Sequence, residues 1–287
     1  MKRSNNKSGK KRFFDSLVDE MRDHKVTFTV YIILRLIVIA LIVVSAVRGY
    51  WENVFTGFLT LLLLLLPAFI EKNFKVNLPT VLEIIALFFV FAAQILGEIQ
   101  GYYLKYSFWD TMLHTVNGFL FAAVGFALVD ILNQNEDIKL SLTPVYMALV
   151  AFCFSMTVGV LWEFFEYSAD CIFKTDMQKD YIIDTISSVK FNPDNVNKAV
   201  VIDGITDVSI NGTPMELGGY LDIGLHDTMK DLIVNFIGAT VFSSIGYIYV
   251  KTRGKKRTIA ALFIPTIKSD NSEEVLRNKD ASDDKTE

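Results

Sequence analysis

The sequence predicts an all-α integral membrane protein of about six transmembrane helices, with a long extracytoplasmic loop between spans five and six. Three observations predict this fold class. Apolar residues make up 52% of the 287 residues, whereas charged residues make up only 21%. The apolar residues are clustered, and the run from Asn53 to Ile70 has no charged side chain and includes six consecutive leucines. A helix in water keeps a polar face, so an apolar run of this length is typical of a bilayer span.

This composition excludes several classes of protein. An ordinary cytosolic enzyme, a nucleic-acid-binding protein and a secreted domain held by disulfides all lack such apolar runs. The two cysteines, Cys153 and Cys171, lie inside an apolar run and just beyond its end, which favours two unpaired small apolar residues. The expected partner is therefore the lipid bilayer and not a nucleic acid.

Each apolar run is expected to cross the membrane as a helix, because lipid offers no hydrogen-bond partner to open backbone groups. The six expected spans are Val26–Val47, Asn53–Ile70, Leu78–Leu96, Thr111–Leu132, Pro144–Ala169 and Thr228–Val250. Short connections make neighbouring spans antiparallel, but the loop at 171–227 is much longer.

Lysine and arginine residues predict the orientation of the chain. Residues 1–25 carry eight of them and residues 251–257 carry five. We therefore expect a bacterial plasma-membrane protein with both termini in the cytoplasm. The expected domains are a basic cytoplasmic segment at 1–25, a six-span domain at 26–250 and a largely disordered, acidic cytoplasmic tail at 251–287.

The long loop contains two runs typical of β-strands, Ala199–Ile202 and Asp207–Ile210. The second run is followed by Asn211-Gly212, a strong signal for a tight hairpin turn. The loop is either a small β-hairpin or lid, or a structured connection, and the sequence leaves both open.

Each of the last three spans carries one polar face, because its acidic, histidine and asparagine residues recur every three or four positions. The three sets are Asp110, His114 and Asn117; Glu163, Glu166 and Asp170; and Asp227, Asp231 and Asn235. The alternating directions of the spans place all three sets at one depth, in the outer leaflet, where Glu98 of span three joins them. We expect a hydrated pocket that opens outward. The alternative is a polar network that only ties the helices together.

Carboxylates at close range repel one another, so some must be protonated, paired or bound to a cation. Oxygen-rich sites suit Mg²⁺, Ca²⁺ or Mn²⁺, and one imidazole also tolerates Zn²⁺ or Fe²⁺. The expected metal ligands are Asp110, His114, Glu163, Glu166, Asp227 and Asp231. The expected catalytic residues are His114, Glu163 and Asp231, with His114 as a general base or a further ligand. The other expected pocket residues are Asn117, Asp170, Asn235 and Glu98.

These blocks resemble the YjdF-type family of multi-pass bacterial membrane proteins, a family of unknown function. That family has an Asp-x3-His block followed by Gly, a Glu-x2-Glu block, and an Asp-x3-Asp block in a helix with Gly-Ala. The matching residues here are Asp110, His114 and Gly118; Glu163 and Glu166; and Asp227, Asp231, Gly238 and Ala239. The resemblance covers spans three to six.

The layout is also similar to the VanZ-like family, some members of which are linked to glycopeptide-antibiotic resistance. Asp231, Asn235 and Gly238 match its last block. Glu166 stands where that family has glutamine, which adds a charge to the predicted site.

Three function classes remain open from the sequence. The first is a cation-dependent enzyme or binder that acts on a lipid-linked or cell-envelope substrate. The second is a proton- or cation-coupled transporter, because buried carboxylates and a histidine can relay protons. The third is a non-catalytic envelope assembly or stress factor that uses the long loop as its interaction surface.

Overall fold

The structure is a computed structural model that describes residues 25–74, 76–134, 141–252 and 262–267. Within these residues, six helical segments are long and apolar enough to cross a membrane. They are Val26–Arg48, Trp51–Asn73, Thr80–Ile99, Trp109–Asn133, Pro144–Phe173 and Leu225–Thr252. Each contains most or all of one predicted span, so the all-α, six-span fold class is confirmed. The predicted cytoplasmic segment at 1–25 lies outside the described residues, except for Lys25.

The chain divides into two compact units. Unit 1 comprises residues 1–155 and 235–287, and unit 2 comprises residues 156–234. The division falls inside two helices, α8 (Pro144–Phe173) and α9 (Leu225–Thr252), so each helix contributes to both units.

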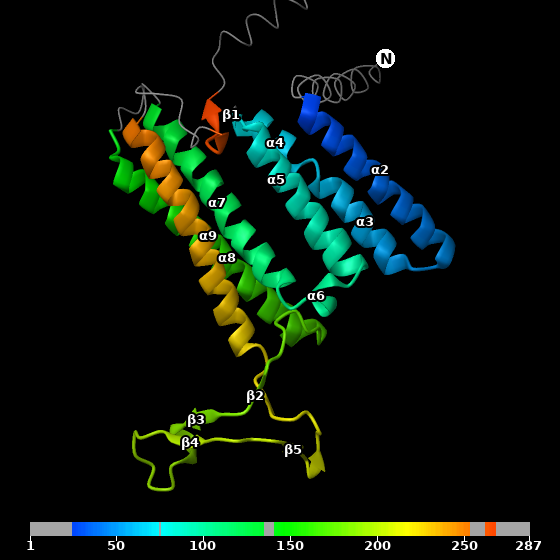
Figure 1. The fold of residues 1–287 in the computed structure, drawn as a ribbon, viewed down its shortest axis with the longest axis vertical. Coiled ribbons are helices and arrows are strands. Elements are labelled where there is room, and N and C mark those ends of the chain that lie inside the picture. Colours follow the sequence, from blue (N-terminus) through cyan, green and yellow to red (C-terminus); the bar gives the residue numbers. More distant parts are fainter. Residues whose placement is uncertain (1–24, 75, 135–140, 253–261, 268–287) are drawn as a thin grey trace, which may run out of the picture. The chain divides into compact units, whose positions relative to one another are not determined.

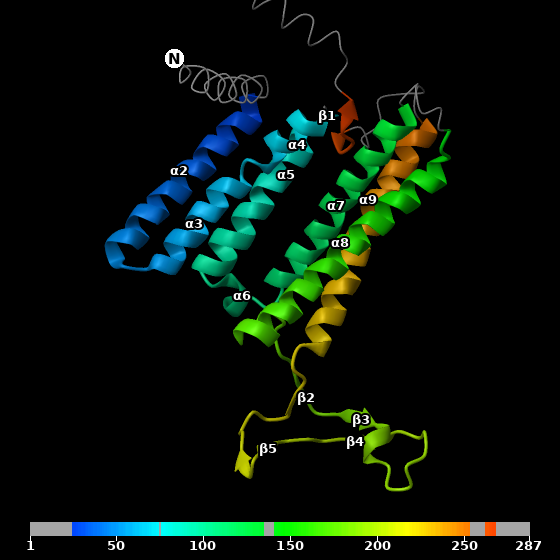
Figure 2. The same cartoon turned by 180° about the vertical axis from the view of Figure 1, so that it is seen from behind.

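The first helices of unit 1 pack against one another around a shared apolar core, and Figures 1 and 2 show α2, α3 and α5 side by side. These helices are α2 (Lys25–Arg48), α3 (Trp51–Leu63), α4 (Leu66–Phe74), α5 (Thr80–Phe91), the π-helix η1 (Ala92–Ile99) and the short α6 (Tyr102–Lys105). The core includes Val38, Leu64, Leu87 and Ile95, all nearly inaccessible to solvent.

The second predicted span is interrupted, and proline explains the interruption. Helix α3 ends at Leu63, and α4 begins at Leu66, directly before Pro67. Proline has no backbone N–H and its ring clashes with the carbonyl four residues earlier, so a continuous helix through Pro67 is disfavoured. The third span changes from α- to π-helix at Ala92, a feature that the apolar pattern did not predict.

Unit 1 also contains α7 (Trp109–Gln134), which packs closely against α9 through two glycines. A Cβ atom at Gly118 would overlap the backbone carbonyl of Asn235, and one at Gly238 would overlap that of Thr115. The hydroxyl of Ser155 in α8 donates a hydrogen bond of 2.7 Å to the Gly118 carbonyl. Small residues allow membrane helices to approach closely, and these contacts fix the three helices together.

The loop in unit 2 is built from three short antiparallel strand pairs. They are β2 (Ile182–Ile183) with β7 (Tyr220–Leu221), β3 (Ile186–Ser188) with β4 (Val200–Ile202), and β5 (Ser209–Ile210) with β6 (Thr213–Pro214). The β5–β6 hairpin turns at Asn211 and Gly212, which both have positive φ angles. A two-residue turn with positive φ at both positions matches the twist of the flanking strands, which is why Asn-Gly is favoured there.

Part of the predicted disordered tail is ordered in unit 1. Strand β8 (Thr266–Ile267) pairs with β1 (Val76–Asn77), and Ile264 is almost fully buried. The ring of Phe263 packs on Phe119 of α7. The apolar segment at 263–267 therefore packs on unit 1. The polar residues 268–287 lie outside the described residues.

Candidate functional site

The first polar pair of unit 1 lies at the start of α7. Asp110 is in the first helical turn, where the helix dipole favours a negative charge, and His114 follows one turn later. The Nε2 atom of His114 lies 3.5 Å from Oδ1 of Asp110, and their side chains are 8% and 24% exposed. A carboxylate beside one ring nitrogen orients the imidazole. Asn117, one turn further along, is half-buried.

Two other predicted residues of unit 1 have different environments. Asn235 is buried in α9, and its backbone carbonyl contacts Gly118. Glu98 is exposed in η1. Unit 1 therefore brings Asp110 and His114 into contact and places Asn235 against the same helix.

The end of α8, in unit 2, carries two buried glutamates. Glu163 and Glu166 are 5% and 7% exposed, and a carboxylate oxygen of each lies within 4.8 Å of the other. The indole N–H of Trp162 donates a 2.8 Å hydrogen bond to Oε1 of Glu166. The spacing of three residues between Glu163 and Glu166 puts both carboxylates on one helix face, as predicted.

The start of α9, also in unit 2, carries two buried aspartates one turn apart. Asp231 is 1% exposed and Asp227 is 3% exposed. One carboxylate oxygen of Asp227 accepts a 2.8 Å hydrogen bond from the backbone amide of Lys179. Lys230 interacts electrostatically with both aspartates, and its ammonium group donates a 2.7 Å hydrogen bond to the hydroxyl of Tyr181.

Asp170 at the end of α8 binds the backbone of the loop. Its carboxylate accepts hydrogen bonds from the amides of Met177 and Gln178 at 2.7 and 2.9 Å, and from the hydroxyl of Thr175 at 2.8 Å. This arrangement fixes the start of the loop. A role for Asp170 in a polar pocket stays a prediction.

A second carboxylate–imidazole pair lies at the start of α9. The carboxylate of Asp222 lies 2.5 Å from Nδ1 of His226, a contact with the same four-residue spacing as Asp110 and His114. Asp222 also accepts hydrogen bonds from the backbone amides of Tyr181, Gly224 and His226. Burial by itself raises the pKa of Asp222, but these amides and the imidazole outweigh it, so the pKa lies below the usual aspartate range.

The sequence interpretation did not single out Asp222. The signal that could have found it is the Asp-x3-His spacing, which occurs twice in the chain. Half of the His226 side chain is exposed, whereas the Asp222 side chain is 3% exposed, so this pair belongs to the surface of unit 2.

The described residues therefore include a buried histidine and several buried carboxylates on helices α7, α8 and α9. Unit 1 holds the donor atoms of His114 and Asp110, and unit 2 holds those of Glu163, Glu166 and Asp231. Imidazole and carboxylate ligands together suit Mg²⁺, Mn²⁺, Ca²⁺ and Zn²⁺.

Residues 30–252, which include all six spanning segments except the first few residues of the first, match a family described as a predicted membrane protein family, DUF2238. The chain belongs to the DUF2238 family. This membership confirms the resemblance to the YjdF type, since YjdF proteins form the DUF2238 family. The similarity to the VanZ-like family stays a prediction.

Membership of DUF2238 and the six apolar helices together make the chain a multi-pass membrane protein in contact with the lipid bilayer. The function of the DUF2238 family is not known. Neither the curated proteins nor the solved structures give a match to the chain.

Proposed function

We propose that this membrane protein is a cation-dependent enzyme or binder that acts on a lipid-linked or cell-envelope substrate. The observation that carries the proposal is the burial of Glu163, Glu166 and Asp231 within apolar spanning helices. Transfer of an ionised carboxylate into a low-dielectric environment is costly unless a counter-charge and hydrogen bonds compensate. A divalent cation compensates several carboxylates at once.

A cation needs more ligands than either pair of contacting donors supplies. Within unit 1, the donors in contact are His114 and Asp110, and within unit 2, Glu163 and Glu166 lie close together. Structural and catalytic metal sites usually need at least three protein ligands for Zn²⁺, and Ca²⁺ takes six to eight oxygens. Neither pair alone meets this requirement, and the helical spacing of the polar residues in the last three spans is what supports the larger ligand set of His114, Asp110, Glu163, Glu166 and Asp231. Asp227 is the sixth ligand of this proposal.

Such a site has a clear chemical use. A bound cation would polarise a phosphate or carbonyl oxygen of the substrate and stabilise negative charge. Asp110 orients the imidazole of His114, whose other ring nitrogen acts either as a general base or as a ligand of the cation. Asn117 and Asn235 would contribute neutral donors and acceptors to the same pocket.

Metal analysis of the purified protein tests this proposal. Wild-type protein, washed free of loosely bound ions, is expected to retain about one divalent cation per chain. Glu163→Gln and His114→Ala, one variant from each unit, are each expected to lose it. The matched control is Glu52→Gln, because Glu52 is an exposed glutamate in the first turn of α3. The proposal would be contradicted if wild-type protein retained no metal and was not activated by added metal.

A proposed orientation completes this function. Both termini lie in the cytoplasm of a bacterial cell, so the polar ends of α7, α8 and α9 open outward. The basic residues that flank the first and last spans support this orientation. A fluorescent protein fused after Glu287 should fluoresce, and alkaline phosphatase inserted at Gly212 should be active. The opposite pattern would contradict the orientation.

A proton-coupled transporter is the second candidate, and Asp130 favours it. This aspartate is 2% exposed in α7, sixteen positions after His114, so one helix carries buried titratable groups near both of its ends. Proton relays in transporters are built from such groups. Proteoliposomes with a pH gradient should then show substrate flux that Asp130→Asn abolishes. Flux that is the same in Asp130→Asn and wild type would contradict this candidate.

A further inference from the structure

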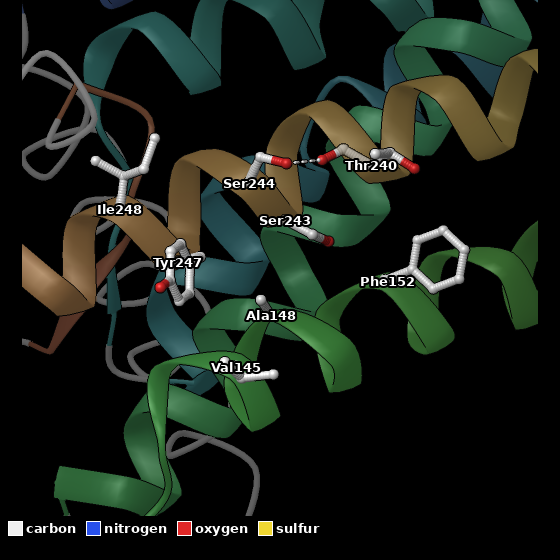
Figure 3. A pocket seen from close by; sticks show the side chains of 8 residues that line it. All are labelled: Val145, Ala148, Phe152, Thr240, Ser243, Ser244, Tyr247 and Ile248. Carbon is white, nitrogen blue, oxygen red and sulfur yellow. Dashed lines mark hydrogen bonds between the residues drawn. The ribbon is translucent and has the colours of Figure 1, made fainter.

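A groove of about 470 Å³ lies in unit 1 between the first half of α8 and the second half of α9. Figure 3 shows the side chains that line it: Val145, Ala148, Phe152, Thr240, Ser243, Ser244, Tyr247 and Ile248. Small-molecule sites commonly have volumes of about 300–1,000 Å³. The lining residues of α9 belong to its C-terminal half, and no residue that lines the groove belongs to the proposed cation site.

One hydroxyl in this groove lacks a partner. Ser243 is 7% exposed, and among the described residues its Oγ has no hydrogen-bond partner. The next residue behaves differently, because the hydroxyl of Ser244 donates a 2.8 Å hydrogen bond to the Thr240 carbonyl of its own helix. A serine in a membrane helix usually satisfies its hydroxyl in the way that Ser244 does. Since a buried polar group without a partner is costly, Ser243 points to a ligand that supplies one.

The polar stripe continues toward the end of α9. Ser243, Tyr247 and Lys251 are spaced four residues apart, so they lie on one helix face about one turn from each other. The ammonium group of Lys251 donates a 3.2 Å hydrogen bond to the Tyr247 hydroxyl and lies 5.3 Å from the centre of its ring. Lys251 therefore extends back toward the groove instead of away from the membrane.

These features describe the chemistry of the occupant. The apolar lining suits a hydrocarbon chain, the Ser243 hydroxyl suits an ester carbonyl, and the Lys251–Tyr247 pair suits an anion. In a glycerophospholipid these three groups follow one another in that order along the molecule. A further four basic residues lie at 253–257 in the sequence, and a cluster of this kind beside a membrane helix is typical of attraction to anionic lipid.

We propose that the groove between α8 and α9 binds one anionic glycerophospholipid. One acyl chain lies along Phe152, and Ser243 donates a hydrogen bond to an ester carbonyl. Lys251 and Tyr247 bind the phosphate. The bound lipid satisfies the Ser243 hydroxyl and fills the space between the two helices. This inference is independent of the proposed function, because it uses none of the residues of the cation site.

Native mass spectrometry of the purified full-length protein tests this site. The protein in mild detergent is incubated with equal amounts of phosphatidylglycerol and phosphatidylcholine of identical acyl chains. Wild type is expected to retain one phosphatidylglycerol in preference to phosphatidylcholine. Ser243→Ala is expected to lower this retention about fivefold, as expected for one hydrogen bond, and Lys251→Glu about tenfold or more. Ser244→Ala is the matched control and is expected to retain lipid like wild type, because Ser244 bonds within its own helix.

Three results would overturn the proposal. The first is equal retention of the two lipids by wild type. The second is a loss in Ser244→Ala as large as that in Ser243→Ala. The third is unchanged retention in both Ser243→Ala and Lys251→Glu. If, in that case, Ser243→Leu dissociates a dimer of the protein, the groove holds a second copy of the chain instead of a lipid. Thermal unfolding and size-exclusion chromatography of each variant show whether the variant is folded.

Discussion

The carboxylates at the base of the loop and those inside the spanning helices have different partners. Asp170 and Asp222 each accept hydrogen bonds from backbone amides of residues in or beside the loop. Glu163 and Asp231 lie within helices, where the backbone amides around them are already bonded to the helix itself. The first group therefore holds the loop to the ends of α8 and α9, and we propose that the second group binds a ligand.

The comparison teaches that acidic residues with the same helical spacing have two separate uses. A carboxylate that accepts two or three amide N–H groups is stabilised in its charged form by the fold alone. A carboxylate buried between spans needs a counter-charge from elsewhere. The predictions below test this division, from the largest expected effect to the smallest.

The largest effect is expected where α7 and α9 meet, because both groups of carboxylates depend on the placement of these helices. In Gly238→Ala the new Cβ would overlap the Thr115 backbone carbonyl, which cannot move without shifting a helix. We expect a loss of about 3 kcal/mol in the free energy of unfolding. Thermal unfolding in detergent checks it. Gly57→Ala is the control, because its Cβ would meet only the movable Ile42 side chain. Equal losses in both variants would contradict the close packing of α7 and α9.

The next effect concerns Asp222 and the base of the loop. In Asp222→Ala the amides of Tyr181, Gly224 and His226 lose their acceptor, which should cost about 2 kcal/mol locally. Hydrogen exchange at these amides should rise about 30-fold, whereas exchange in the middle of α9 should stay unchanged. Unchanged exchange at all three amides would contradict the structural role of Asp222.

The pH dependence of the same contact has a definite sign. The pKa of Asp222 in the folded chain lies below its usual value of about 3.9, so its stabilisation is complete above that value. The stabilisation is lost as the pH falls below about 3.9 and through the lower folded-state pKa. Amide exchange at Tyr181, corrected for its intrinsic pH dependence, should therefore show constant protection from pH 7 to pH 5 and weaker protection below pH 4. Protection that weakens first between pH 7 and pH 6 would contradict this role of the Asp222 carboxylate.

The smallest effect is expected at the tip of the loop. Gly212 has a φ of +83°, a conformation that costs a residue with a Cβ about 1 kcal/mol. Gly212→Ala should raise exchange in the β5–β6 hairpin and leave the amides beside Asp222 unchanged, because the tip and the base use separate contacts. A change at both places would show that the loop unfolds as one piece.

The sequence predicts the six spans because the bilayer requires long apolar runs, and it predicts the hairpin turn because Asn211-Gly212 has a strong local preference. The amide contacts of Asp170 and Asp227 could not be predicted in this way. The partner of Asp227 is Lys179, 48 residues away, and helical spacing has no information about such a distance. The burial of Ile264 was missed for a similar reason, since a short apolar segment in a polar tail reveals nothing about its partner strand β1.

The sequence predicts which residues share a helix face in the candidate site, but it does not predict their hydrogen-bond partners. Periodicity correctly places Glu163 and Glu166 on one buried face and puts His114 beside Asp110. Periodicity does not distinguish them from Asp170, which has the same spacing but binds the loop. The distinction comes from the position of the helix end, because a carboxylate in the last turn reaches amides that follow the helix.

A Mn²⁺ titration followed by electron paramagnetic resonance tests the central claim most directly. The proposed site predicts one bound Mn²⁺ in wild type, and an affinity at least about tenfold lower in Glu163→Gln and Asp231→Asn. Asp222→Asn, which changes a carboxylate of the loop base, should bind Mn²⁺ like wild type. Equal binding by all four proteins, or loss of binding in Asp222→Asn alone, would contradict the assignment of the ligand site to the carboxylates inside the spans.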